Sequence, residues 1–110
     1  MSDKPKIVCL CGSTKFYEQF KEANCRETMD GKIVLSVGCF IHQPDAQLGG
    51  GTVDYTTDQK RALDELHKRK IDLADEILII NVGDYIGEST RSEIEYAMKQ
   101  GKPVRYLESK

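Results

Sequence analysis

Short apolar runs alternate with amphipathic segments along this chain. The apolar runs are rich in β-branched residues, as buried parallel strands are, and cover 6–11, 33–37, 76–82 and 104–107. The segments between them repeat apolar residues at helical spacing and cover 15–29, about 56–73 and 89–100. This alternation predicts an α/β domain in which helices cover both faces of a parallel sheet.

The expected architecture is a small doubly wound sheet, flavodoxin- or Rossmann-like, with about four strands in the order 2-1-3-4. That order follows if the chain reverses direction across the sheet after the second strand. Residues 39–55 fall outside the alternation and contain Pro44 and a Gly49-Gly50-Gly51 run. A loop of this length in a compact domain is usually functional or disordered. The 110 residues fit a single domain, 1–110.

Composition narrows the possible partners. The net charge is −2 and acids and bases are interspersed, whereas a nucleic-acid surface would need a basic excess on one face. No apolar run approaches the roughly 20 residues that span a bilayer, and the first residues lack the apolar core of a signal peptide. We therefore expect a cytoplasmic protein that binds neither nucleic acid nor membrane. The modest core makes a homodimer the expected oligomer.

The four cysteines are Cys9, Cys11, Cys25 and Cys39. Cys9 and Cys11 alternate along the first strand, and we expect them to point to opposite faces of the sheet. The C-x-x-C spacing is absent, and neither histidine stands at a metal-ligand offset from a cysteine. Buried, reduced thiols are therefore favoured over a zinc site or a disulfide, and we expect neither a metal nor a cofactor.

Two segments are predicted to meet at one crevice. In an open parallel sheet, ligands bind beyond the carboxyl ends of the strands at the switch point, here between the first and third strands. The segments 12–15 (GSTK) and 83–93 both lie there, and each leads into a helix N-terminus that favours phosphate. The P-loop and dinucleotide fingerprints are absent. An ordinary Ser/Thr helix cap explains the first segment equally well.

Glu93 has two possible roles in the second segment. Thr90 and Glu93 fit the T-x-x-E capping box, and pattern alone favours this structural role. Alternatively, Glu93 is a carboxylate fixed one turn into a helix and facing the crevice. The helix dipole would then keep it ionised and ready to act as a nucleophile.

The stretch 74–104 (ADEILIINVGDYIGESTRSEIEYAMKQGKPV) resembles the nucleoside 2-deoxyribosyltransferase family and the related 2-deoxynucleoside 5-monophosphate N-glycosidases. The more specific part of the pattern is the spacing from Asp75 through Glu93 to Gly101. The segment 11–14 (CGST) looks like the small-residue nucleotide loop of the N-glycosidase branch. The resemblance covers both ends of the chain well and residues 39–55 hardly at all.

The resemblance implies that the Glu93 carboxylate attacks the anomeric carbon of a nucleoside or nucleotide. A glycosyl-enzyme forms, and water or a second base resolves it. The resemblance also places Asp84 near the sugar or base as a second catalytic residue. The expected ligand is a small molecule. The candidate binding residues are two histidines and residues in or next to the two crevice segments: Cys11, Gly12, Ser13, Thr14, Lys15, His42, His67, Asn81, Gly87, Ser89, Thr90 and Arg91. A lone histidine such as His42 is more often a plain surface residue.

Three positions depart from the family pattern. Glu95 replaces the usual glycine two residues after the nucleophile, and His67 stands where the N-glycosidase branch has an acid. Arg91 is unusual so close to the nucleophile and favours an anionic ligand. A module of the same fold that binds or sequesters a nucleotide without chemistry is therefore the alternative function. A phosphoribohydrolase, suggested by Gly50-Gly51-Thr52, is discounted because that run lies in the irregular segment.

Overall fold

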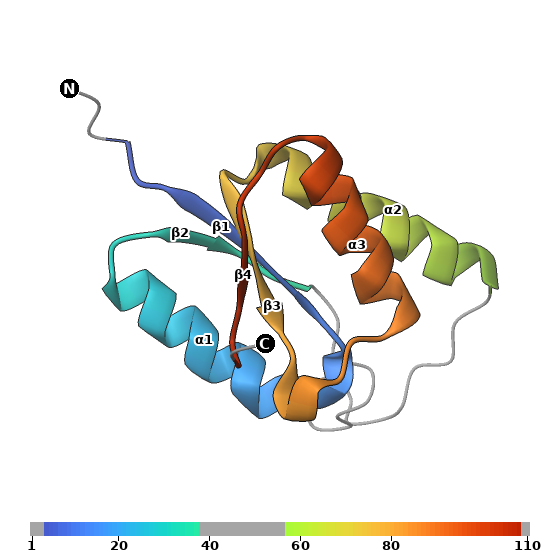
Figure 1. Ribbon diagram of the computed structural model, residues 1–110, viewed down its shortest axis with the longest axis horizontal. Helices are drawn as coiled ribbons and strands as arrows, with labels where there is room; N and C mark the ends of the chain where they lie inside the picture. The colour runs from blue at the N-terminus through green and yellow to red at the C-terminus, as the bar shows by residue number, and fades with distance from the viewer. Residues whose placement is uncertain (1–3, 38–56, 109–110) are drawn as a thin grey trace.

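The computed structural model describes residues 4–37 and 57–108, which form one parallel sheet with helices on both sides (Figure 1). The strands are β1 (Ile7–Gly12), β2 (Ile33–Leu35), β3 (Glu76–Ile80) and β4 (Val104–Tyr106). All pairings are parallel and the order is β2-β1-β3-β4. The predicted α/β class and the predicted strand order are therefore confirmed.

The helices are α1 (Tyr17–Met29), α2 (Thr57–Leu73) and α3 (Glu88–Lys99), with short 3-10 turns η1 (Thr14–Phe16) and η3 (Val82–Asp84) after the two central strands. The expected helix over 15–29 thus begins as a separate 3-10 turn, and the last helix begins one residue earlier than expected. The predicted loop 39–55, including His42 and Cys39, lies outside the described residues. Within the described ranges, no helix has the length and apolar character needed to cross a membrane.

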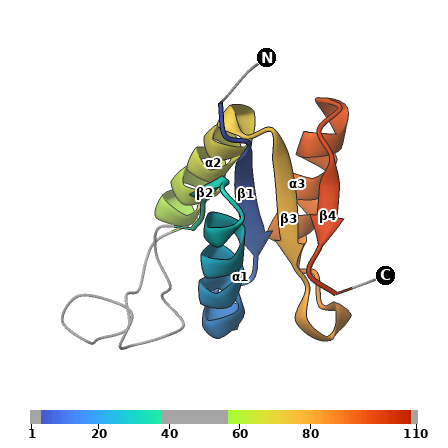
Figure 2. The same cartoon turned by 90° about the vertical axis from the view of Figure 1, so that its left-hand side faces the viewer.

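The two faces of the sheet carry separate cores, with α1 on one side and α2 and α3 on the other (Figure 2). On the α1 side, alternate strand residues pack with two helix residues: Val8, Leu10, Leu78, Ile80, Phe20 and Ala23. On the α2–α3 side, the intervening strand residues pack with three helix residues and with Ala74, which follows α2: Cys9, Cys11, Ile77, Ile79, Ile71, Ala74, Ile94 and Ala97. Cys9 and Cys11 therefore share one face. The expectation that they point to opposite faces is wrong, because residues two apart in a strand lie on the same side.

Gly12 allows β1 to end close against β3. A Cβ at this position would lie 2.9 Å from the Ile80 carbonyl oxygen and 3.0 Å from the Ile80 Cβ. Any larger residue would push the two central strands apart at their carboxyl ends. The glycine predicted to bind a ligand therefore has a packing role that is sufficient to explain it.

A buried ion cluster ties α1 to the far edge of the sheet. Arg105 on β4 donates to the Glu27 carboxylate at 2.7 Å and to Glu76 at 3.1 Å. Lys32 lies 3.1 Å from Glu27. The hydrogen bond from Arg105 keeps the pKa of Glu27 below its usual value although burial opposes the shift. This cluster connects α1 with β3 and β4 through two buried carboxylates and a partly exposed guanidinium group.

Candidate functional site

The two crevice segments do meet, through side chains of η1 and of the turn after β3. The rings of Phe16 and Tyr85 pack edge to face with centroids 5.9 Å apart. The Lys15 ammonium lies 3.8 Å from the centroid of the Tyr85 ring, a cation–π contact. The predicted neighbourhood is therefore present, but Lys15 is engaged with an aromatic face there.

Ser13 acts as the cap of η1. Its Oγ accepts a hydrogen bond from the Lys15 backbone N–H at 3.3 Å, and its carbonyl accepts one from Phe16 N–H at 3.1 Å. Thr14, the first residue of η1, is half-buried. The ordinary helix-cap explanation of this segment thus accounts for Ser13.

Asn81 and Asp84 do not face a common ligand site. The Asn81 side chain is fully buried, and its amide exchanges two hydrogen bonds with the Glu108 backbone, at 3.0 and 2.9 Å. Asp84 is exposed at a φ of 66° on η3. Asn81 therefore holds the end of β4, and Asp84 lies outside the set of residues that line the pocket described next.

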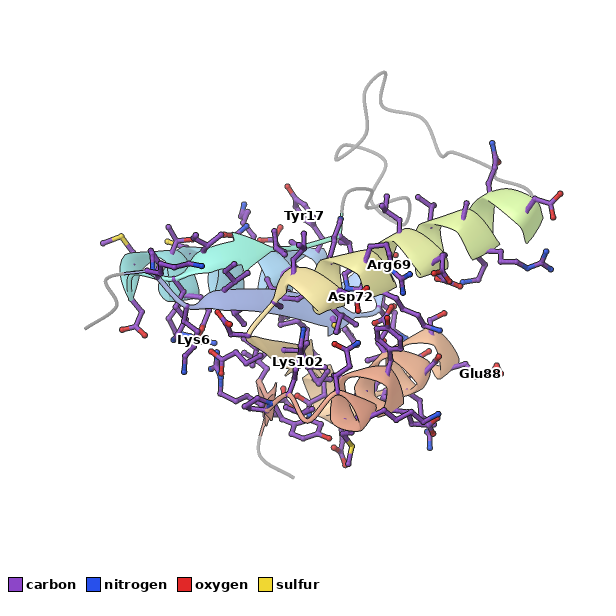
Figure 3. All side chains as sticks on the ribbon, turned by 90° about the horizontal axis from the view of Figure 1, so that it is seen from above. Lys6, Tyr17, Arg69, Asp72, Glu88 and Lys102 are labelled. Carbon is purple, nitrogen blue, oxygen red and sulfur yellow. The ribbon has the colours of Figure 1, made fainter. Side chains whose placement is uncertain are left out.

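A pocket of about 360 Å³ lies between α2 and α3. Its lining comes from two turns of α2 and the first turns of α3: Asp64, Lys68, Glu88, Ser89, Ser92 and Glu93. Figure 3 shows the two helices side by side, with Glu88 at the pocket end of α3 and Lys102 beyond the other end. This volume is within the range of small-molecule sites. Two residues predicted from the sequence, Ser89 and Glu93, belong to it.

The opposite end of the helix pair is closed by a polar clamp. The Tyr96 hydroxyl donates to Asp72 and accepts from Arg69, both at 2.7 Å. The Lys102 ammonium donates to the carbonyls of Ile71 and Asp72 at 2.7 and 2.8 Å. The helices are thus fixed at this end, and the pocket occupies the end at which α3 begins.

Glu93 does not form the predicted capping box. Helix α3 begins at Glu88 after an extended Gly87, whose carbonyl accepts a hydrogen bond from Arg91 N–H at 2.9 Å. Thr90 and Glu93 therefore lie inside the helix, and both are buried. The structural role favoured by the pattern is wrong, because T-x-x-E specifies a spacing but not the residue at which the helix starts.

The surroundings of Glu93 favour its neutral form. Burial raises the pKa of Glu93 to about 7, and the charges of Cys9 and Asp64 act in the same direction, whereas His67 and a hydrogen bond with Cys11 oppose them. The expectation that the helix dipole keeps Glu93 ionised is wrong. The dipole acts mainly on the first turn, and Glu93 lies in the second.

A cluster of two thiols and one imidazole lies beneath Glu93. The Nε2 atom of His67 lies 3.6 Å from Cys9 Sγ and 3.5 Å from Cys11 Sγ, and all three side chains are buried. A hydrogen bond from Cys11 lowers the pKa of Cys9 to about 5, against burial, and raises the pKa of Cys11 well above its usual value. Burial depresses the pKa of His67, but the hydrogen bond with Cys9 and the Cys9 and Glu93 charges outweigh it and raise that pKa.

Sequence reasoning missed this cluster. His67 is 56 residues from Cys11 along the chain and reaches it only because α2 packs on β1. The available signal was the Cys-x-Cys spacing, which in a strand places both thiols on one face. His67 therefore contacts the cysteines, and it is not among the residues that line the pocket.

The two remaining departures from the family pattern lie outside the pocket. Arg91 and Glu95 are exposed on α3, and neither is among the lining residues. Residues two apart in a helix point in different directions, so Glu95 turns away when Glu93 faces inward. Glu95, two residues after the proposed nucleophile, therefore does not crowd the pocket.

Comparison of the chain with protein-family models, curated proteins and solved structures found no significant match.

Proposed function

We propose that this protein cleaves or transfers the N-glycosidic bond of a nucleoside or nucleotide, with Glu93 as the nucleophile. One observation carries the proposal: Glu93 is a buried carboxyl group, without a capping role, at the wall of a pocket that suits a small molecule. The resemblance of residues 74–104 to the 2-deoxyribosyltransferase family supports the same residue independently.

In the proposed reaction, the ionised form of Glu93, which a pKa of about 7 leaves populated at neutral pH, bonds to the anomeric carbon. The bond between that carbon and the base nitrogen breaks, and the base leaves with the electron pair and takes up a proton. Water then attacks the same carbon, releases Glu93 and gives up a proton, so the hydrolysis balances. In transfer, a second base takes the place of water.

The pocket offers groups for the other roles. Asp64 lines it one helical turn before His67, so it is our candidate for the proton donor to the leaving base. The Lys68 ammonium and the Ser89 and Ser92 hydroxyls lie beside the N-terminal turn of α3. The positive end of the α3 dipole, this cation and the two hydroxyls would together hold an anionic group such as a 5-phosphate, against the opposing charges of Asp64 and Glu88 in the same lining.

A non-catalytic nucleotide-binding module is the second candidate. It is favoured by the positions of Asp84, which is exposed, and His67, which contacts cysteines and not the pocket. Two of the groups that the family resemblance implies near the ligand are thus unavailable for chemistry.

The test is base release from a panel of nucleosides and 5-monophosphates, followed by chromatography, together with calorimetric binding of the same compounds. We expect Glu93→Gln to abolish base release while binding persists. Glu95→Gln, which removes an exposed carboxylate on the same helix, is the control and should retain release. Binding without release by the unmodified protein would establish the binding module instead.

We further propose that the protein acts as a cytoplasmic homodimer. Exposed apolar side chains on α2 and α3, namely Leu63, Leu66 and Met98, support a second copy covering this side of the molecule. Sedimentation equilibrium tests it: a monomer at micromolar concentration would contradict the dimer.

A further inference from the structure

The cluster of Cys9, Cys11 and His67 has no part in the proposed glycosidic reaction. It brings together two thiols and an imidazole, which are all common metal ligands. We propose that these three side chains bind a divalent metal ion of the zinc type in the core beneath the Glu93 pocket. The proposal rests on their geometry and ligand chemistry, and it is independent of the proposed function.

The two nitrogen–sulfur distances already match those around a tetrahedral zinc ion. Zinc binds thiolate sulfur at about 2.3 Å and imidazole nitrogen at about 2.0 Å, so a tetrahedral angle places a sulfur and a nitrogen ligand about 3.5 Å apart. The distances from His67 Nε2 to the sulfurs of Cys9 and Cys11 are 3.6 and 3.5 Å. All three ligand atoms lie within 4.8 Å of one another. The imidazole and the two sulfurs therefore need little movement relative to each other to take up an ion.

The three groups come from rigid elements. Cys9 and Cys11 occupy one face of the central strand β1, which is paired on both sides, and His67 projects from α2. Ligands placed on a strand and a packed helix are held in position more firmly than ligands on loops. The cluster is thus a preformed site.

Charge and softness select the kind of ion. Two thiolates and a neutral imidazole carry two negative charges, which a divalent ion neutralises, so the core need not hold an unpaired charge. Sulfur and imidazole ligands favour zinc over magnesium or calcium, which prefer oxygen. Cys11 is among the groups that act on the pKa of the Glu93 carboxyl group, which therefore borders the site on the pocket side.

The experiment uses the full chain, reduced, stripped with chelator and handled without oxygen. It is titrated first with Co²⁺, whose thiolate charge-transfer and tetrahedral ligand-field bands report the ligands directly. We expect both bands to saturate at about one ion per chain and to disappear when Zn²⁺ replaces cobalt. Failure of the unmodified protein to develop a thiolate-to-cobalt band would overturn the proposal without a variant.

Variants identify the ligands. Cys9→Ser and Cys11→Ser should each lose the charge-transfer intensity of one thiolate. Each should also weaken zinc binding at least about tenfold, because loss of a group that only supports a ligand already lowers metal affinity by that factor. Cys25→Ser is the matched control, since Cys25 is an exposed free cysteine on α1, and it should bind as the unmodified chain does. Unchanged spectra in folded Cys11→Ser would contradict the assignment, as would loss of the bands in Cys25→Ser.

A thermal measurement covers the case in which a cysteine variant fails to fold. An ion that binds only the folded chain raises the midpoint of unfolding. Zinc should therefore raise the midpoint of the unmodified protein and of Cys25→Ser, and excess chelator should reverse the rise. The absence of a zinc-dependent shift in both proteins would count against the site.

Discussion

The Nε2 atom of His67 lies 3.5 Å from the Sγ atom of Cys11, which joins α2 to the central strand β1. This contact directs the imidazole towards the sheet. His67 occupies the sequence position at which the N-glycosidase branch has an acid, and its side chain faces the core instead of the pocket. The proposed reaction would therefore take its second carboxyl group from Asp64, one turn earlier on α2, or from Glu88, which also lines the pocket.

The raised pKa of Glu93 predicts that this residue destabilises the fold at high pH. The folded-state pKa is about 7 and the ordinary value is 4.5, so the folded chain holds the proton more tightly than the unfolded chain does. Stability therefore falls as pH rises from about 4.5 and levels off above 7. With chelator present, Glu93→Gln should be more stable to unfolding than the unmodified protein by roughly 3 kcal/mol at pH 8, and the two should be almost equally stable near pH 4.

Urea unfolding of both proteins at several pH values measures this difference. Glu95→Gln, at an exposed position on the same helix, should show no comparable dependence. A Glu93→Gln variant whose advantage does not grow with pH would show that Glu93 titrates normally in the folded chain.

Glu27 should have the opposite pH dependence. Its pKa is lowered, mainly by the hydrogen bond from Arg105. Glu27 therefore stabilises the fold fully above its unfolded-state pKa, and this stabilisation is lost as the pH falls through its folded-state pKa. Glu27→Gln should cost about 1–3 kcal/mol at pH 7, because Arg105 loses one of its two buried carboxylate partners. At low pH the variant and the unmodified protein should converge.

Denaturant unfolding between pH 3 and pH 7 checks the prediction. Glu22→Gln on the exposed side of α1 is the control and should change stability by less than about 0.5 kcal/mol. Equal destabilisation by Glu27→Gln at both ends of the range would mean that packing, not charge, accounts for the loss.

The sheet could be predicted from the sequence because each strand is a short apolar run bounded by turn residues. The helix starts could not be predicted as well. Thr90 and Glu93 have the spacing of a capping box, but the extended Gly87 begins α3 earlier and moves both residues inside the helix. Local patterns specify spacing, and the position of a terminus depends on how the chain leaves β3.

The candidate site was likewise only partly predictable from the sequence. Glu93 and Ser89 do line a pocket, but this pocket lies between α2 and α3 and its lining includes none of residues 12–15. It is therefore not the crevice expected at the carboxyl ends of the central strands. Asn81 was misplaced, since nothing local shows that its amide pairs with the Glu108 backbone beyond β4. The contact of His67 with the cysteines depends on long-range packing in the same way.

Gly12→Ala should destabilise the protein at the junction of the central strands. The added Cβ would meet the backbone carbonyl of Ile80 at 2.9 Å, and neither strand can move without disturbing the pairing. A cost of about 1–3 kcal/mol is typical of such overpacking. Gly87→Ala is the control, because its Cβ would meet only the flexible end of Tyr85, at 3.2 Å, and thermal unfolding should distinguish the two variants.

The pocket cation should distinguish nucleotides from nucleosides. Lys68 lines the pocket beside Ser89, at the N-terminal turn of α3, where an anionic group is favoured. Lys68→Ala should therefore weaken the binding of a 5-monophosphate about tenfold. Added salt should reduce the difference in affinity between the variant and the unmodified protein, since a partly exposed charge is screened.

The same variant should bind the corresponding nucleoside almost unchanged, because no phosphate is there to be neutralised. Calorimetric titration with both ligands measures the two affinities, and Lys99→Ala, exposed at the opposite end of α3, is the control that should alter neither. Equal weakening of nucleoside and monophosphate by Lys68→Ala would show that this cation contacts the base or sugar, and the phosphate would then have to lie elsewhere in the pocket.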